Sequence, residues 1–329
     1  MVGSPQWNNG PIASAGAATF GSGVTGTSGV VSAANSLVGS TAGDSVGSLV
    51  NALSNGNYVV TSRLWDNGAI AGAGAVTFGS GVSGISGAVS TANSRVGSTT
   101  NDNVGGAGVA ALSNGNYVVC SRAWNNGATA DVGAVTFGSG VSGISGAVSP
   151  ANSLVGSTAG DQISDLQAVA LGNGNYVVRS KFWDNGGIAD AGAITLGLFN
   201  GSVTGPITNT HSVLGSVALQ GVTQSSSYDA LRNQLAVGQP ASNRVVLQRT
   251  GIATATSIVG DAPDPAVGGQ PVTFTATVSA SPNAPTNGEV TFTASSGESC
   301  VDTTPTSTSA TTADFSCTIA FTGNGAATV

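Results

Sequence analysis

A short motif that contains a tryptophan, an amide and, in most copies, a cation recurs four times along this sequence. Tryptophan is followed by Asp or Asn, then by Asn and Gly, and a basic residue stands two positions before it in three copies. Indole rings flanked by cations and amides can bind a sugar or a partner protein. The predicted ligand-binding residues are Trp7, Trp65, Trp124, Trp183, Arg63, Arg122, Lys181, Asp66 and Asp184.

A packing role also accounts for these residues, and the sequence favours it. A tryptophan that recurs in every copy of a repeat can be a wedge between neighbouring copies, while its cation is simply solvated. Solvent exposure separates the two interpretations. Indoles that are more than about half exposed favour binding, and buried indoles favour packing.

No catalytic constellation accompanies the tryptophans. His211 is the single histidine, and no serine or cysteine near it stands in a motif typical of a catalytic nucleophile. A histidine-based triad is therefore not expected. A glycosidase or lyase would need paired carboxylates about 5–10 Å apart, whereas Asp44, Asp102 and Asp161 recur at one repeat position instead of forming pairs. We therefore expect a non-enzymatic protein with no catalytic residue, no cofactor and no metal site.

The tryptophans are positioned by a repeat of 58–59 residues, because they lie 58, 59 and 59 residues apart. In one copy, Asn55-Gly56 separates two apolar runs and predicts a hairpin with a type I′ turn. A third run covers residues 73–78, and a fourth spans 86–98. The tryptophan loop is expected to join the second strand to the third.

Four short strands per repeat, in a meander, are typical of one propeller blade. The composition, rich in Gly, Ala, Ser, Thr, Val and Asn, also suits short strands joined by tight turns and suits helices poorly. The predicted fold is all-β: over residues 1–249, a repeat β-propeller of about five four-stranded blades, incomplete at the N-terminus. A parallel β-solenoid is the alternative.

The charge of the chain limits its partners. The formal net charge is −7, and Lys181 is the single lysine. Nucleic acid and anionic membranes bind clustered cations, so neither is an expected partner. The longest apolar runs are too short for a transmembrane helix, and membrane insertion is not expected.

The repeat resembles known families in its strand motifs. The order NGNYVV (55–60), loop, GAVTFG (74–79) resembles the FG-GAP repeats of integrin-type propellers, and so do residues 2–5, 235–240 and 243–247. The copies more closely resemble WDNG-type repeats of large bacterial surface and two-partner-secreted proteins. The first hairpin lacks the acidic loop of calcium-binding FG-GAP copies, and a calcium site needs six to eight oxygen ligands. Calcium is therefore not expected.

The sequence changes character at residue 250. Residues 271–278 and 315–321 alternate with period two, and Pro and Gly turns stand between such runs. Residues 250–329 resemble a bacterial Ig-like β-sandwich, truncated at its end, with TSIVGDAPDPAVGGQPVTFTATV as the opening. Cys300 and Cys317 are predicted to form a disulfide worth about 3 kcal/mol; the alternative is two buried thiols.

These features together predict a secreted or cell-surface module with an adhesin-like or structural role. An export signal is then expected upstream of this sequence. The alternative is a carbohydrate- or protein-binding module that uses the Trp-Asp/Asn-Asn-Gly loops on one propeller face. Its partner would be a glycan or a cell-surface protein.

Overall fold

The computed structural model describes residues 1–229, 234–249, 254–262, 270–280, 290–294, 297–309 and 312–320. The chain divides into two compact units, Met1–Arg249 and Thr250–Val329. Strands dominate both units, and the helices among the described residues are two short 3-10 turns, η1 (Gln220–Val222) and η2 (Pro240–Ser242). The fold is therefore all-β. None of the described helices is long and apolar enough to cross a membrane.

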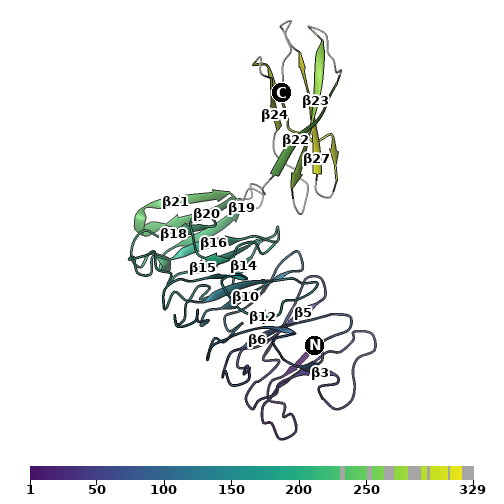
Figure 1. Ribbon diagram of the computed structural model, residues 1–329, viewed down its shortest axis with the longest axis vertical. Coiled ribbons are helices and arrows are strands. Elements are labelled where there is room, and N and C mark those ends of the chain that lie inside the picture. The colour runs from purple at the N-terminus through teal and green to yellow at the C-terminus, as the bar shows by residue number, and fades with distance from the viewer. Residues whose placement is uncertain are drawn as a thin grey trace. The chain divides into compact units, whose positions relative to one another are not determined.

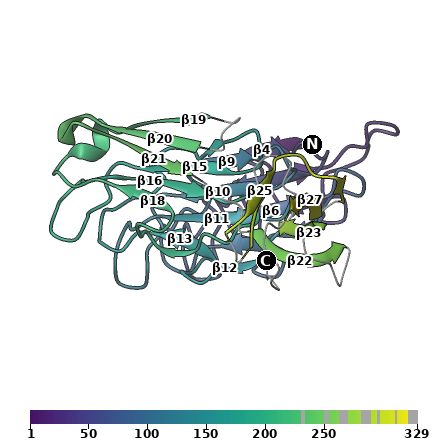
Figure 2. The same ribbon diagram turned by 90° about the horizontal axis from the view of Figure 1, so that it is seen from above.

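Four antiparallel meanders make up most of the first unit, one for each copy of the repeat. The sheets are β1 (Val2–Ser4), β2 (Ala17–Thr19) and β3 (Ser36–Val38); β4 (Leu49–Ala52), β5 (Tyr58–Ser62), β6 (Ala75–Gly79) and β8 (Ser94–Val96); β9 (Gly108–Ala111), β10 (Tyr117–Ser121), β11 (Ala134–Gly138) and β13 (Ser153–Val155); β14 (Val169–Ala170), β15 (Tyr176–Ser180), β16 (Ala193–Gly197) and β18 (Ser212–Leu214). A last sheet contains β19 (Ser225–Asp229), β20 (Gln234–Gln239) and β21 (Arg244–Arg249), which lie side by side (Figure 2).

Short strands from one copy extend the sheet of the copy before it. β7 (Gly87–Ala88) pairs in parallel with β3, β12 (Gly146–Ala147) with β8, and β17 (Gly205–Pro206) with β13. The fourth predicted strand, residues 86–98, is thus two elements with different partners. Its second half completes the sheet of its own copy, and its first half ties that copy to the preceding one.

The sheets follow one another in chain order along the first unit (Figure 1), from the sheet of β3 to the sheet of β21. No closed propeller is present among the residues that the structure describes, so the predicted ring of blades is not confirmed. The alternative of a parallel β-solenoid also differs from the structure, because each meander is antiparallel and the parallel pairs between copies are two residues long.

The core of this unit lies between successive sheets. On β5, Tyr58 and Val60 pack against Leu37 of the first copy, whereas Val59 packs against Val119 of the third. All five residues of β5 are buried. A strand covered on both faces needs a continuous apolar run instead of an alternating one, and this explains the recurring NGNYVV.

The hairpin turns differ from the prediction in type. The Gly56 nitrogen donates to the Leu53 carbonyl at 3.1 Å, and Gly56 has φ +87°. The φ of Asn55 is not positive, although a type I′ turn requires positive φ at both central residues. The turn is therefore type I followed by a glycine bulge, the common three-residue hairpin loop.

The second unit contains two sheets that share a core. One contains β22 (Thr254–Ala262), β23 (Pro271–Ala280), β27 (Thr312–Ala320) and β26 (Ser307–Thr308), and the other is the hairpin of β24 (Val290–Thr293) and β25 (Ser299–Asp302). Phe274 and Ile319 of the first sheet pack against Phe292 of the second. Residues 263–269 of the predicted Ig-like opening lie outside the described residues.

Cys300 on β25 and Cys317 on β27 are joined by a disulfide, with 6.1 Å between their Cα atoms. The bond links the two sheets of the second unit. In the chain-entropy model, the closed loop of this size lowers the entropy of the unfolded chain and stabilises the fold by about 3 kcal/mol.

Candidate functional site

Each tryptophan loop is held in shape by its own residues. In the second copy the backbone N–H of Trp65 donates to the Ser62 carbonyl at 3.1 Å, and the backbone N–H of Gly74 donates to the Trp65 carbonyl at 2.9 Å. The Asp66 carboxylate accepts the Gly72 N–H at 2.8 Å. The same side-chain cap recurs in the other copies at Asn8, Asn125 and Asp184. Asp66 and Asp184, two of the predicted ligand-binding residues, therefore close their own loops.

The tryptophan side chains are buried. Trp65, Trp124 and Trp183 are 3%, 2% and 5% exposed, whereas Trp7 of the first copy is half-buried. Trp124 belongs to the core between the second and third copies. Three of the four indoles thus meet the condition that favours packing between copies, and the structure does not gather them on an open face.

A buried acid joins the tryptophan loop of the second, third and fourth copies to the copy before it. Asp102 accepts the N–H groups of Ser98 and Thr99 at 2.8 Å each, and the N–H of Asn125 in the next copy at 3.0 Å. Asp44 and Asp161 make equivalent bonds. These acids are fully or almost fully buried. Each of these acids, with the backbone N–H groups that it accepts from two copies, forms what we call a joint between repeats. None of the three lies in an open site.

Two opposing effects act on the pKa of Asp44, the acid that joins the first and second copies. Burial raises the pKa of Asp44 above its ordinary value, while hydrogen bonds from the backbone of Asp66, Thr41 and Ser40 act to lower it. Burial is the larger effect. In the fourth copy the acceptor is the neutral Gln220, whose Oε1 accepts the N–H of Ser216 at 2.9 Å.

A second set of hydrogen bonds between copies, the hairpin ladder, joins the hairpin turn of one copy to the next copy. It was not predicted from the sequence. Ser54 Oγ donates to the Leu112 carbonyl at 3.0 Å. Asn55 and Asn57 both donate to the Gly140 carbonyl, at 2.7 and 2.8 Å. The sequence does contain a signal for it, the recurrence of Asn-Gly-Asn in three copies. A turn needs only the first two of these residues, so the repeated second asparagine indicates a further role.

The three predicted cations have different environments. Lys181 forms an ion pair of 2.9 Å with Asp165 and lies 4.5 Å from the centre of the Phe182 ring. Arg63 and Arg122 are exposed, and both line one hollow of about 130 Å³. Its other lining residues are Asn103, Gly106 and Ala123. The structure thus brings together two of the predicted site residues, from neighbouring copies.

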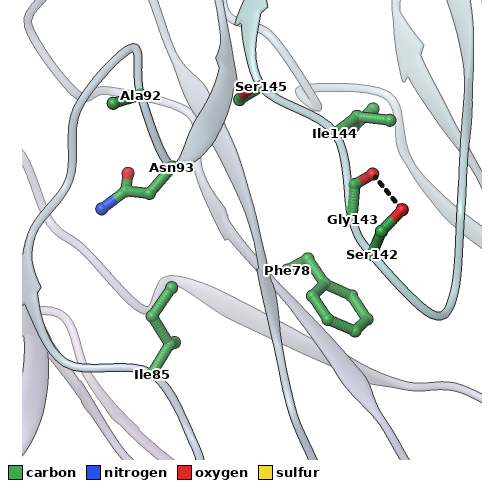
Figure 3. A pocket seen from close by; sticks show the side chains of 8 residues that line it. All are labelled: Phe78, Ile85, Ala92, Asn93, Ser142, Gly143, Ile144 and Ser145. Atoms are coloured by element: carbon green, nitrogen blue, oxygen red, sulfur yellow. Dashed lines mark hydrogen bonds between the residues drawn. The ribbon is translucent and has the colours of Figure 1, made fainter.

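A larger hollow of about 330 Å³ lies between the long loops of the second and third copies. Figure 3 shows Phe78, Ile85 and Ile144 around it, with Asn93 nearby. The loop approaches Phe78 closely at Gly143, where an added Cβ would lie 2.5 Å from the Phe78 Cβ. This hollow is mainly a packing feature of neighbouring loops, since its lining contains no ionisable side chain.

The remaining reactive groups do not form a site. Cys120 is buried, and burial raises the pKa of its thiol, so the nucleophilic thiolate is disfavoured. Within the described ranges, no three His, Cys, Asp or Glu side chains lie together as metal ligands would.

The structure defines a tandem-repeat β protein whose recurring side chains join one copy to the next. Residues 1–48, 52–106, 111–165 and 170–224 match the model of a family described as a repeat of unknown function (DUF5650), and the chain belongs to this family. The sheet β19–β21 follows the fourth matched segment. No protein with a curated description matches the chain.

Proposed function

We propose that this chain is a non-enzymatic structural module of a secreted or cell-surface protein, with an adhesin-like role. The observation that carries the proposal is how the recurring residues are used. Trp65, Trp124 and Trp183 are buried between copies, and the acids at the joints accept backbone N–H groups across the copies. A repeat whose recurring side chains maintain its stacking is suited to build an extended scaffold.

Two further observations support an extracellular location. The disulfide between Cys300 and Cys317 is of a kind that persists in oxidising compartments. The two-sheet core of the second unit supports the finer proposal that residues 250–329 are a bacterial Ig-like sandwich, of the kind that follows repeats in surface proteins. Such a domain would then follow the first unit in the chain.

The experiment that tests this function is detection of the protein on intact cells of the organism that encodes it. An antibody against the first unit should label unpermeabilised cells, or detect the protein in the medium. Thiol alkylation without reduction should leave Cys300 and Cys317 unmodified. Labelling that requires permeabilised cells, together with reduced Cys300 and Cys317, would contradict the proposal.

The alternative is a carbohydrate- or protein-binding module that uses the tryptophan loops. Burial of Trp65, Trp124 and Trp183 argues against stacking of sugars on the indoles. The observation that favours binding at these loops is the pair of exposed cations, Arg63 and Arg122, at a shared hollow.

A further inference from the structure

Two arginines from neighbouring copies line the same small hollow. Arg63 follows β5 of the second copy and Arg122 follows β10 of the third. Both are exposed. Throughout the part of the chain that the structure describes, neither guanidinium takes part in an ion pair or a side-chain hydrogen bond. The hollow is therefore lined by two guanidinium groups that have no ion-pair partner among the described residues.

The nearby acids are engaged elsewhere. Asp102, next to the lining residue Asn103, accepts three backbone N–H groups. Asp66 accepts the Gly72 N–H. The equivalent cation of the next copy, Lys181, has a carboxylate partner in Asp165 at 2.9 Å. The unpaired arrangement is thus specific to the joint between the second and third copies.

The hollow's lining favours a small polar ligand. Besides the two arginines it is lined by Asn103, Gly106 and Ala123. It offers no aromatic or large aliphatic pocket of the kind that anchors protein partners. Guanidinium groups present planar pairs of N–H donors that match carboxylate, sulfate and phosphate oxygens.

We propose that Arg63 and Arg122 form a binding site for an oxyanion, such as the carboxylate or sulfate group of an acidic sugar. An oxyanion between the two guanidinium groups relieves their mutual repulsion and satisfies their donors. Asn103 also lines the hollow, and its Nδ2 donates to the Asn101 carbonyl at 2.9 Å, so recognition of the ligand is assigned to the two arginines. The site does not depend on the structural role proposed above, since a scaffold and a binding protein could both contain it.

Calorimetric titration of the full chain at low ionic strength tests the proposal. The probes are sodium sulfate, sodium phosphate and galacturonate, with uncharged galactose as the comparison. We expect the oxyanions to bind and galactose not to bind. Which of the three binds most tightly identifies the recognised group.

The variants assign the binding to the hollow. Because a hydrogen bond to a charged group contributes about 1.5–3 kcal/mol, R63A/R122A should weaken oxyanion binding by about tenfold or more. R63K/R122K keeps both charges but lacks the planar fork, and should bind with intermediate affinity. R244A, which removes an exposed arginine of β21, is the matched control and should bind as the unmodified protein does.

Three results would overturn the proposal. One is equal oxyanion affinity in the unmodified chain and in R63A/R122A. Another is an equal loss in R244A, which would indicate a general charge effect. The third is binding of galactose as tight as that of galacturonate. Because both arginines are exposed, unchanged circular dichroism of the variants is expected and confirms that they are folded.

Discussion

The Asp102 carboxylate accepts the backbone N–H of Asn125 at 3.0 Å, and so ties the end of one repeat to the tryptophan loop of the next. The bond crosses the joint beside Trp124, which is 2% exposed. A buried carboxylate is costly unless its lone pairs are satisfied. Here two further N–H groups satisfy it. The same side chain that ends one copy thus positions the loop of the following copy.

Replacing this acid should open the joint. We expect D102A to lower the free energy of unfolding by about 2–4 kcal/mol, because three part-buried N–H groups lose their acceptor and a hydrogen bond to a charged group contributes about 1.5–3 kcal/mol. Denaturant unfolding followed by tryptophan fluorescence measures the loss. The control is D131N, which changes an exposed acid with φ +51° to a residue that tolerates that conformation. A D102A midpoint equal to that of D131N would contradict the role of the joint.

The joint at Asp44 should give the protein a pH dependence. Burial raises the pKa of this carboxyl above 3.8, so the folded state holds the proton more tightly than the unfolded state. The contribution of this group to stability is therefore greatest at low pH, and it falls as pH rises from 3.8 through the raised pKa. Above the raised pKa it no longer changes.

The measurement compares unfolding midpoints of the unmodified chain and D44N between about pH 3.5 and 7. The difference between their midpoints should shift across that range in favour of D44N as pH rises, because D44N lacks the titrating group. A difference that stays constant with pH would show that folding does not perturb this carboxyl.

The indoles give a direct test of the packing interpretation. A neutral quencher should reach Trp7, which is half-buried, and leave Trp65, Trp124 and Trp183 mostly unquenched. We expect W124A to cost about 3–5 kcal/mol of stability, the usual cost of truncating a buried aromatic residue. W7A should cost less in the same unfolding experiment. Comparable quenching of all four indoles would instead place them on an open face.

Much of the repeat is readable from the sequence, and its stacking is not. Tandem tryptophans and Asn-Gly turns locate the copies, the hairpins and the loop between β5 and β6. Whether the copies stand in a ring or in a line depends on contacts such as that of Asn55 with the Gly140 carbonyl. Its acceptor is a backbone atom, which has no signature in the residue type.

Other details were missed because one pattern fits two structures. The letters Asn-Gly suit a type I′ turn, yet they also suit a type I turn followed by a glycine bulge. Gly56 has a positive φ in either case, and the φ of Asn55, which is not positive, identifies the latter. Gly87–Ala88 pairs with β3 of another copy, and two residues are too few to show a period. Repetition of the tryptophan likewise suits both a wedge and a binding face, so only its burial decides between them.

The disulfide should stabilise the second unit alone. We expect C317S to lower the stability of residues 250–329 by about 3 kcal/mol in the chain-entropy model, while the first unit unfolds as before. Calorimetry that resolves two transitions, or hydrogen exchange followed by residue, measures the two units separately. The control is C120S, in the core of the first unit, which should affect only the other transition. Equal effects of C317S on both units would contradict their independence.

The close approach of Gly143 to Phe78 should be sensitive to a single methyl group. Gly143 has φ +69°, and an added Cβ would lie 2.5 Å from the Phe78 Cβ. Gly127 has a similar φ, +61°, but open space around its Cβ position. Both G143A and G127A therefore introduce the same backbone strain, and only G143A adds a steric clash between the second and third copies.

We expect G127A to cost about 1 kcal/mol, from strain alone, and G143A to cost about 1–3 kcal/mol more, as overpacking does. The difference between their unfolding free energies isolates the contact between loop and Phe78. The change F78A removes the ring, whose Cγ and Cδ1 would lie 2.8 and 3.1 Å from the added Cβ, but it keeps the Phe78 Cβ at 2.5 Å. The double variant F78A/G143A should therefore recover only a small part of the loss, through the shared contact. Equal stabilities of G127A and G143A would show that the long loop can move away from Phe78 without cost, and that the joint relies on the Asp102 bonds and the hairpin ladder instead.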